Sequence, residues 1–370
     1  MNKEFKRIII YPSYSMRDYK TNVYLLNSDA EFNQMIIEAK ILTKYFEEVF
    51  LIIPNENQRK LGMERIPDGI QIIEKKYEYN VGTERYSEND KEFFKKIIDD
   101  NTVLYSNFPH KWKYFDEIGI PSENILYTFW HFYPDFEGKH YMPMKKNLGI
   151  IFRSEKQKTV FEKKTILNES WYYVLKSHHG LESIRNSKFS DNKVPSLVIP
   201  TRFDHEDFNH TWEALSIALA LKNDLKSKFK LILCNPNNSG NLSHLINIAD
   251  EIGPIPKERF EDILKNEQGV IFVKKETDYG GTKGAPEYLS SNLIFISNDY
   301  NINPYDIQGN DNTIFYSYIK RLLTIEREEY YRIKNLQKKI CEKHHGTKNI
   351  YKLFDKIFNK NIGEKFDSNR

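Results

Sequence analysis

Residues 7–53 read RIIIYPSYSMRDYKTNVYLLNSDAEFNQMIIEAKILTKYFEEVFLII, and this stretch decides the fold class. The apolar, β-branched runs at 7–11 and 49–53 are typical of buried strands. Between them, apolar residues recur at a spacing of about 3.6 from Phe32 to Leu42, which predicts an amphipathic helix. A strand, a helix and a second strand in this order favour a parallel sheet that is covered by helices.

The same alternation continues along the chain. In the first half we expect further strands at 70–73, 103–105, 125–129, 148–152 and 172–175, and helices at about 88–99, 110–118 and 155–164. A polar stretch at 183–193 has no apolar face to bury, so we interpret it as a linker. After it we expect strands at 196–199, 230–234, 270–273 and 293–297, and helices at 212–225, 242–249, 257–265 and 286–291. Residues 316 to about 358 are predicted to be helical, with a break near Gly346.

The predicted organisation is therefore α/β, with two doubly wound, Rossmann-like domains. We expect an N-terminal domain over residues 1–190 and a C-terminal domain over residues 191–340. Residues 341–370 are predicted to form a C-terminal helix that packs back on the N-terminal domain, followed by a frayed tail. Two such domains would face each other across a cleft between the carboxyl ends of their sheets, where ligands of α/β proteins bind.

The composition excludes several classes of protein. The 370-residue chain has 39% hydrophobic and 29% charged residues, which argues against disordered, collagen-like and low-complexity proteins. Its formal net charge of +3 does not indicate a nucleic acid partner, although it does not exclude one. Two cysteines cannot form a disulfide framework or a four-thiolate zinc site. Because no signal-like segment and no run of about 20 apolar residues is visible, we expect a cytoplasmic protein.

The stretch most informative about function is residues 276–296, ETDYGGTKGAPEYLSSNLIFI. It follows a predicted strand, is rich in glycine, and enters a helix in whose first turn Pro286 fits well. Backbone N–H groups at Gly280, at Gly281 and at the start of this helix suit a phosphate, and Glu287 can turn its carboxylate toward a ribose diol. The same residues also fit an ordinary strand, turn and helix, in which the glycines shape the turn.

These residues resemble the nucleotide-sugar glycosyltransferases of the GT-B fold, most nearly the large retaining family 4. Tyr279-Gly280 is similar to the Phe-Gly turn of that family, and residues 286–291 are similar to the helix whose glutamate binds the donor ribose. The resemblance implies two Rossmann-like domains and makes Glu287 the ribose ligand. The family places another acidic residue eight positions earlier, facing the donor sugar. Tyr279 holds that position here, and Asp278 beside it is the candidate carboxylate.

Two more segments of the second half match the family. Residues 252–264 resemble a glycine, valine-proline and helix segment whose backbone contacts the nucleobase, which assigns Ile255 and Pro256 to that contact. Arg202 follows a predicted strand where the family carries a glycine-arginine pair, and an arginine there can stabilise the charge that grows on the leaving diphosphate. The lysine that the family adds shortly afterwards is missing. Lys283 in the glycine turn is our candidate for supplying that charge.

The first half carries a weaker resemblance. His131 lies just past a predicted strand, where the family often has a histidine beside the donor sugar, and it is suited to hydrogen bonding as well as to proton transfer. Ser154 is predicted to cap the following helix. Ser13, Tyr14 and Arg17 lie in the loop after the first strand, where such enzymes place an acceptor-facing or phosphate-facing loop. We assign these three residues to the acceptor side.

The predicted activity is the transfer of a sugar from a nucleotide-diphosphate donor, UDP- or GDP-linked, to a hydroxyl acceptor. Arg202, His131 and Asp278 are the predicted catalytic residues, and retention of anomeric configuration is implied by the resemblance alone. The acceptor stays open between a glycan, a lipid-linked sugar and a modified DNA base, and a peripheral membrane contact stays open too. A nucleotide-sugar epimerase of the same fold and a non-catalytic binding protein are the alternatives.

No metal and no other cofactor is expected. No Asp-x-Asp triplet occurs, so the clasp that holds a metal and a diphosphate in single-domain glycosyltransferases has no obvious ligands. His205 and His210 lie five positions apart instead of the four that a zinc-binding helix face needs. The sequence has no Walker A motif and no Gly-x-Gly-x-x-Gly after a strand, which weakens kinase, ATPase and dehydrogenase interpretations.

Overall fold

The chain divides into two units, each built around its own parallel sheet. A computed structural model describes residues 5–12, 17–18, 23–26, 30–60, 66–76, 88–107, 112–129, 147–164, 172–176, 187–200, 211–234, 245–274, 284–298 and 311–358. The first unit comprises Met1–Lys176 and Thr347–Arg370, and the second comprises Ser177–Gly346. The domain boundaries expected from the sequence lay after residues 190 and 340.

Seven parallel strands form the sheet of the first unit, in the order β10-β9-β8-β7-β1-β4-β6. They are β1 (Arg7–Tyr11), β4 (Glu48–Pro54), β6 (Ile70–Lys75), β7 (Thr102–Ser106), β8 (Ile125–Phe129), β9 (Gly149–Phe152) and β10 (Tyr172–Val174). The chain grows from β1 outward to β6, returns to β7 on the other side of β1, and then grows to β10. This reversal creates a topological switch point between β1 and β7.

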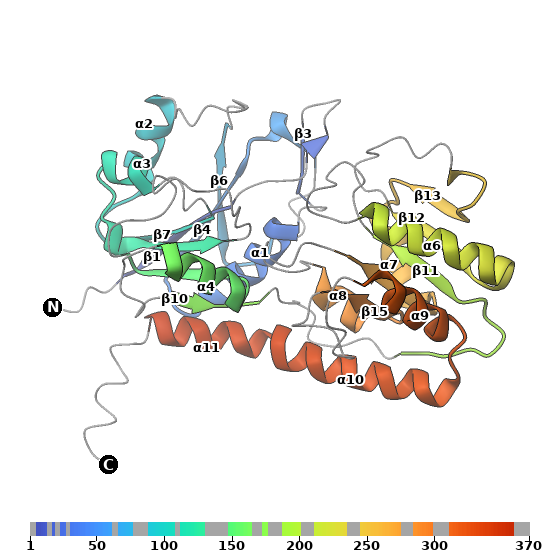
Figure 1. Ribbon diagram of the computed structural model, residues 1–370. Coiled ribbons are helices and arrows are strands. Elements are labelled where there is room, and N and C mark those ends of the chain that lie inside the picture. Colours follow the sequence, from blue (N-terminus) through green and yellow to red (C-terminus); the bar gives the residue numbers. More distant parts are fainter. Residues whose placement is uncertain are drawn as a thin grey trace, which may run out of the picture. The chain divides into compact units, whose positions relative to one another are not determined.

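Helices cover both faces of this sheet (Figure 1). One face carries α1 (Ala30–Leu42) and α11 (Thr347–Phe358), and the other carries α2 (Glu88–Ile97), α3 (Trp112–Glu117) and α4 (Glu155–Lys164). Ile8 and Ile10 of β1 point into the first core, whereas Ile9 and Tyr11 point into the second, as the alternation of side chains along a strand requires. The last helix therefore belongs to the core of the first unit, through Ile350, Leu353, Phe354 and Ile357.

A small three-stranded sheet in the first unit was not expected from the sequence. It consists of β2 (Arg17–Asp18), β3 (Val23–Leu25) and β5 (Arg59–Lys60), with β3 antiparallel to β2 and parallel to β5. Strands of two or three residues are too short to leave a periodic pattern, so the sequence carries no signal for them.

Five parallel strands form the sheet of the second unit, in the order β13-β12-β11-β14-β15. They are β11 (Ser196–Ile199), β12 (Lys230–Cys234), β13 (Glu251–Gly253), β14 (Gly269–Val273) and β15 (Ile294–Ser297). Gly269, at the start of β14, has φ +129°, and a Cβ atom there would lie 2.2 Å from the backbone oxygen of Ser196. Glycine is therefore required for β14 to pair with β11.

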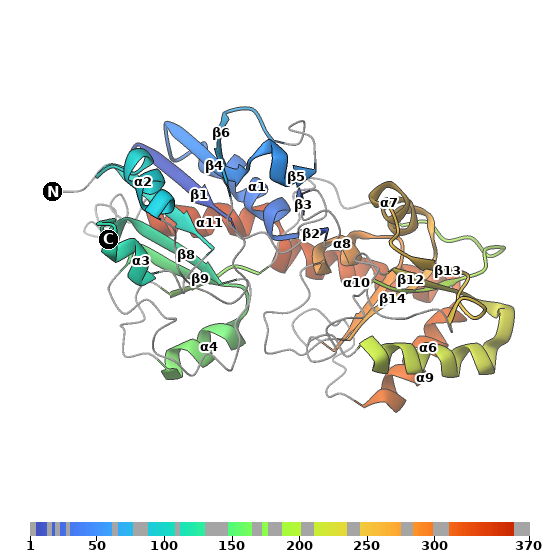
Figure 2. The same cartoon turned by 90° about the horizontal axis from the view of Figure 1, so that it is seen from above.

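Helices also cover both faces of the second sheet. One face carries α6 (Thr211–Leu225) and α9 (Asn312–Leu323), which lie side by side (Figure 2). The other carries α7 (Lys257–Asn266) and α8 (Ala285–Ser290). The long helix α10 (Arg327–His345) contributes Tyr330 and Ile333 to the first of these cores and Cys341 to the second. The α/β fold with doubly wound parallel sheets and C-terminal helices is confirmed.

Two predicted helices need correction. Residues 245–249 form turns instead of the end of a helix over 242–249, and Ile246 is 60% exposed. The reason is a contact between segments distant in the sequence: Asp250 accepts a hydrogen bond from the backbone N–H of Leu231 in β12 at 2.7 Å, and this contact leads the chain directly into β13. The helical region predicted from residue 316 is interrupted at 324–326 as well as at Gly346, where the predicted break is confirmed.

Candidate functional site

The carboxyl ends of β11 and β14 mark the point where the second sheet reverses its direction of growth. The two strands pair in parallel, with Val198 opposite Ile271. After β11 the chain passes through α6 to β12 on one side, and after β14 it passes through α8 to β15 on the other. The next helices, α6 and α8, pack on opposite faces of the sheet, and open α/β sheets bind their ligands at such points.

The predicted diphosphate residues follow these two strand ends in the sequence. Arg202 comes three positions after Ile199, the last residue of β11, and Gly280 comes seven positions after Val273, the last residue of β14. The topology thus brings the two predicted segments to adjacent starting points. The residues themselves lie outside the part of the chain that the structure describes: Arg202, Asp278, Tyr279, Gly280, Gly281 and Lys283.

The predicted ribose ligand lies on α8, which follows the glycine-rich segment. Of the six residues of this helix, five are buried, and Glu287 is exposed. Gly284 precedes the helix and packs against a side chain one turn later, since a Cβ atom at this position would lie 2.5 Å from Cζ of Tyr288. Glycine at position 284 therefore leaves room for the Tyr288 ring, and α8 keeps its single carboxylate on the outside.

The predicted nucleobase segment packs on the same face of the sheet as α8. The ring of Tyr288 makes edge contacts with Phe295 of β15, at 5.4 Å between centroids, and with Phe260 of α7, at 6.4 Å. Burial raises the pKa of the Tyr288 hydroxyl far above its usual value. Ile255 is half-buried against this core, whereas Pro256 is exposed at the N-terminus of α7. The structure thus brings Ile255 and the helix of Glu287 onto one shared core.

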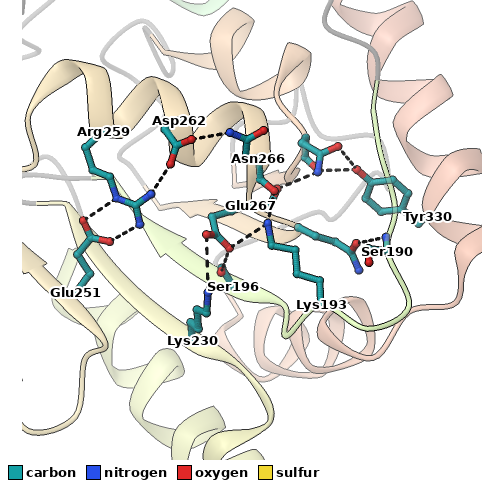
Figure 3. A network of polar contacts seen from close by, with 12 residues as sticks. Ser190, Lys193, Ser196, Lys230, Glu251, Arg259, Asp262, Asn266, Glu267 and Tyr330 are labelled. Carbon is teal, nitrogen blue, oxygen red and sulfur yellow. Dashed lines mark hydrogen bonds and ion pairs between the residues drawn. The ribbon is translucent and has the colours of Figure 1, made fainter.

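Arg259 fixes the start of α7 to the edge of the sheet (Figure 3). Its guanidinium group donates to both carboxylate oxygens of Glu251, at 3.2 and 2.8 Å, and to Asp262 at 2.5 Å. The hydrogen bond from Asn266, together with Arg259, lowers the pKa of the Asp262 carboxyl. Sequence reasoning did not single out these residues. Their role is to hold the segment that contains Ile255 and Pro256.

A second polar cluster lies at the amino ends of β11 and β14, opposite to the ends where the candidate site is expected. Glu267 follows α7 and accepts a hydrogen bond from the hydroxyl of Ser196, the first residue of β11, at 2.8 Å (Figure 3). Lys193 and Lys230 lie 3.8 Å from its two carboxylate oxygens. Because these contacts gather at the amino ends of β11 and β14, they anchor the sheet and do not belong to the carboxyl-end site.

Lys274 is a buried cation at the site that sequence reasoning missed. It directly follows β14, and its side chain has no exposed surface. Its Nζ atom forms an ion pair with Glu213, in the first turn of α6, and a hydrogen bond of 2.5 Å with Asn312, the first residue of α9. The contacts tie the end of the central strand to the starts of both helices. The sequence carries no signal for its burial, because its partners lie far away along the chain.

The predicted residues of the first unit lie mostly outside the described part of the chain. Ser13, Tyr14 and His131 are among these, although the strand that precedes His131, β8, is described. Arg17 lies in β2, and its side chain is not described. The prediction for Ser154 is confirmed, since its hydroxyl accepts a hydrogen bond of 3.1 Å from the backbone N–H of Gln157 and caps α4.

A buried polar network lies near the carboxyl ends of β7, β9 and β10. Arg153, directly after β9, donates to Glu38 of α1 at 2.9 Å and to the backbone oxygen of Leu175, directly after β10, at 3.4 Å. Tyr105 of β7 donates to the second carboxylate oxygen of Glu38. Burial, followed by the charge of Glu38, raises the pKa of the Tyr105 hydroxyl. This network fixes the strand ends from which the first unit's predicted site would be built.

Two kinds of feature are missing from the described residues. No group of three or more His, Cys, Asp or Glu side chains there is arranged to hold a metal ion. Among the same residues, no helix combines the length and the apolar character that crossing a membrane requires.

The fold is shared with solved glycosyltransferase structures. No family model matches the sequence, and no curated protein matches it either. The N-terminal domain of a Candida albicans trehalose-6-phosphate phosphatase superposes with a TM-score of 0.66 at 12% identity, covering 97% of this chain and 98% of that one. The α,α-trehalose 6-phosphate synthase of Burkholderia multivorans superposes with a TM-score of 0.63 at 9% identity, and the superposition covers 99% of each chain.

A third structure contains a nucleotide. The pneumococcal O-GlcNAc transferase GtfA, solved with UDP and GlcNAc, gives a TM-score of 0.54 at 13% identity and covers 73% of this chain. The present chain spans 59% of that protein. At these identities the likeness establishes the fold, which is that of GT-B glycosyltransferases, as the sequence predicted.

Proposed function

We propose that this protein is a glycosyltransferase that moves a sugar from a nucleotide-diphosphate donor to a hydroxyl acceptor. The observation that carries the proposal is the topology of the second sheet. Its switch point lies between β11 and β14, and the segments with Arg202 and with Gly280 leave from these two strand ends. The helix that follows the second segment exposes one carboxylate, Glu287. The shared GT-B fold supports the same conclusion.

The donor is proposed to bind in the second unit. Arg202 and Lys283 would pair with the diphosphate, and the backbone N–H groups of Gly280 and Gly281 would donate to it. Glu287 would accept hydrogen bonds from the ribose hydroxyl groups. The backbone at Ile255 and Pro256 would contact the base, because this segment shares a core with α8. Tyr279 and Asp278 would face the sugar.

The acceptor is proposed to bind in the first unit. Ser13, Tyr14 and Arg17 would contact its hydroxyl groups, and His131 would hydrogen-bond at the donor sugar. The acceptor class is a hydroxyl-bearing molecule such as a glycan or a lipid-linked sugar. We place the reaction in the cytoplasm, with a UDP- or GDP-linked sugar as the donor.

The proposed reaction breaks the bond between the anomeric carbon and the leaving diphosphate oxygen and forms a bond from that carbon to the acceptor oxygen. The acceptor's proton leaves with the diphosphate or passes to solvent. Arg202 would stabilise the negative charge that develops on the leaving group, which is where electrostatic catalysis contributes most. No metal ion takes part in this proposal, because cationic side chains supply the charge. The transfer is proposed to retain the anomeric configuration.

A donor screen tests the proposal. The full chain is incubated with UDP- and GDP-sugars and a mixture of glycan acceptors, and products are read by mass spectrometry. We expect one nucleotide sugar to be consumed with release of its nucleoside diphosphate. Glu287→Ala should abolish this turnover, whereas Glu258→Ala, which removes an exposed carboxylate from the first turn of α7, should not. Full activity in Glu287→Ala would contradict the assignment, and conversion of the donor to an isomer would indicate an epimerase.

A further inference from the structure

The helix α10 packs against α8 and β15, and its buried side chains include a lysine. Lys334 is 4% exposed. Its Nζ atom donates hydrogen bonds to the backbone oxygens of Leu289, at 3.2 Å, and Leu293, at 2.8 Å, and to Oε1 of Gln337, at 3.0 Å. An ammonium group has three N–H donors, so each of them finds an oxygen here.

One of these acceptors belongs to the end of α8. Leu289 lies in the last turn of the helix, and Leu293 follows the turn that leads into β15. Carbonyl groups in the last turn of a helix lack intrahelical partners, and a cation beside them is favourable. A helix of six residues is too short to be stable by itself. The position of α8 therefore depends on contacts such as the one with Lys334.

The same face of α10 contacts the start of α8 and the next strand. The Sγ atom of Cys341 lies 3.7 Å from the backbone oxygen of Pro286, in the first turn of α8. The side chain of Gln337 donates to the backbone oxygen of Phe295 at 2.7 Å and accepts from its N–H at 3.3 Å. Three successive turns of α10 thus fasten α8 at both ends and join it to β15.

Burial of a lysine side chain at this position is energetically unfavourable. Burial lowers the pKa of Lys334 to about 7, against a smaller opposite effect of Cys341. Lysine is almost never fully buried unless its charge is paired, and an apolar side chain would fill the same space without loss of hydration. The three hydrogen bonds offset part of this loss of hydration. Their acceptors are the backbone of α8 at Leu289, the backbone of Leu293 in the turn after it, and the side chain of Gln337, which also binds β15.

We propose that Lys334 is a positioning residue of the donor site, which fixes α8 in the place from which Glu287 reaches the nucleotide. The inference rests on the proposed function. Because the neighbours of Glu287 on α8 are buried, a shift of the helix end would carry its carboxylate with it. Lys334 does not touch the donor in this account. It acts through the helix that carries the ribose ligand.

Hydrogen exchange of the full chain tests the structural half of the proposal. Lys334→Met removes the donors, and Ile333→Ala is the matched control, because Ile333 is the neighbouring buried residue of α10 but packs into the core of α6 and α9. Below pH 7, where the amine carries its proton, Lys334→Met should speed exchange of the α8 amides about tenfold more than Ile333→Ala does. Equal exchange in the two variants would overturn the proposal.

Nucleotide affinity tests the functional half. UDP and GDP are titrated into the full-length protein by calorimetry. Lys334→Met should weaken binding of the preferred nucleotide by about tenfold, and Ile333→Ala by less than about twofold. In a Glu287→Ala background, Lys334→Met should have no further effect, since the ligand it positions is gone. An undiminished effect in that background would contradict positioning through Glu287.

Three further outcomes have defined consequences. If Lys334→Met does not fold, Lys334→Gln takes its place, since its shorter amide cannot make the same three bonds. If neither UDP nor GDP binds the wild type, the proposed function fails and the positioning role fails with it. If the wild type binds and Glu287→Ala binds measurably more weakly, but Lys334→Met binds like Ile333→Ala, the proposed function stands and the inference about Lys334 is wrong.

Discussion

Replacement of Gly284 by alanine should displace the buried tyrosine of α8. The new Cβ atom would lie 2.5 Å from Cζ and 2.6 Å from Oη of Tyr288, closer than real Cβ contacts come. The ring cannot move away easily, because it is 9% exposed and packs against Phe260 and Phe295. Overpacking of this kind lowers the free energy of unfolding by about 1–3 kcal/mol. For a unit of this size, that corresponds to a fall in Tm of roughly 2–12 °C.

Urea denaturation of a double-mutant cycle isolates the contact. Tyr288→Leu removes the ring atoms that the new methyl group meets. In that background, Gly284→Ala should therefore lower the free energy of unfolding much less. We expect a coupling free energy of about 1–2 kcal/mol between the two substitutions. Gly284→Ala should also weaken UDP or GDP binding, because it shifts the helix that carries Glu287. Additive effects of the two substitutions on the free energy of unfolding would refute the reasoning.

Three further changes have defined outcomes. Lys274→Met should lower the free energy of unfolding by about 1–3 kcal/mol in urea titrations, because Glu213 and Asn312 lose their buried donor; an unchanged midpoint would contradict the role given to Lys274. Glu38→Gln should lower the free energy of unfolding by about 3–5 kcal/mol, since it leaves Arg153 buried without its carboxylate. As the control, Glu47→Gln at an exposed ion pair should be nearly neutral in the same assay. The pKa of Lys334 falls from 10.5 to about 7 on folding, so the unfolded chain binds one more proton between these values. The free energy of unfolding of the wild type, relative to Lys334→Met, should therefore rise by up to about 1.4 kcal/mol per pH unit from pH 7 towards pH 10, and a constant difference would show that the pKa is not lowered.

Most of the fold was predictable because its signal is local. Apart from β13, the strands of both large sheets are short apolar runs, and the helices between them have one or two buried stripes, so periodicity marks them. The edge strand β13 was not predicted, because its three residues are a glutamate, an isoleucine and a glycine. The small sheet of β2, β3 and β5 was not predictable, because its strands are too short to have a period. The turns at 245–249 contain apolar residues that suggest a helix. Their conformation depends instead on a contact between Asp250 and a strand distant in the sequence, Leu231.

The candidate site could be predicted only in part from the sequence. A motif and its spacing pointed to Glu287, which the structure shows exposed on α8, and its role as the ribose ligand stays a prediction. Lys274 and Lys334 were not predicted, since nothing in the sequence distinguishes a buried lysine from the many solvated ones. Their partners come from helices far along the chain, for example Glu213 for Lys274 and Leu289 for Lys334. Such contacts arise from tertiary packing, which a single sequence does not reveal.

A crystal structure of the full chain with its preferred nucleoside diphosphate tests the central claim most directly. We predict that the diphosphate lies beside the carboxyl ends of β11 and β14, with the ribose hydroxyl groups within hydrogen-bonding distance of Glu287. A nucleotide bound at the sheet of the first unit, or bound in the second unit with its ribose away from α8, would contradict the account.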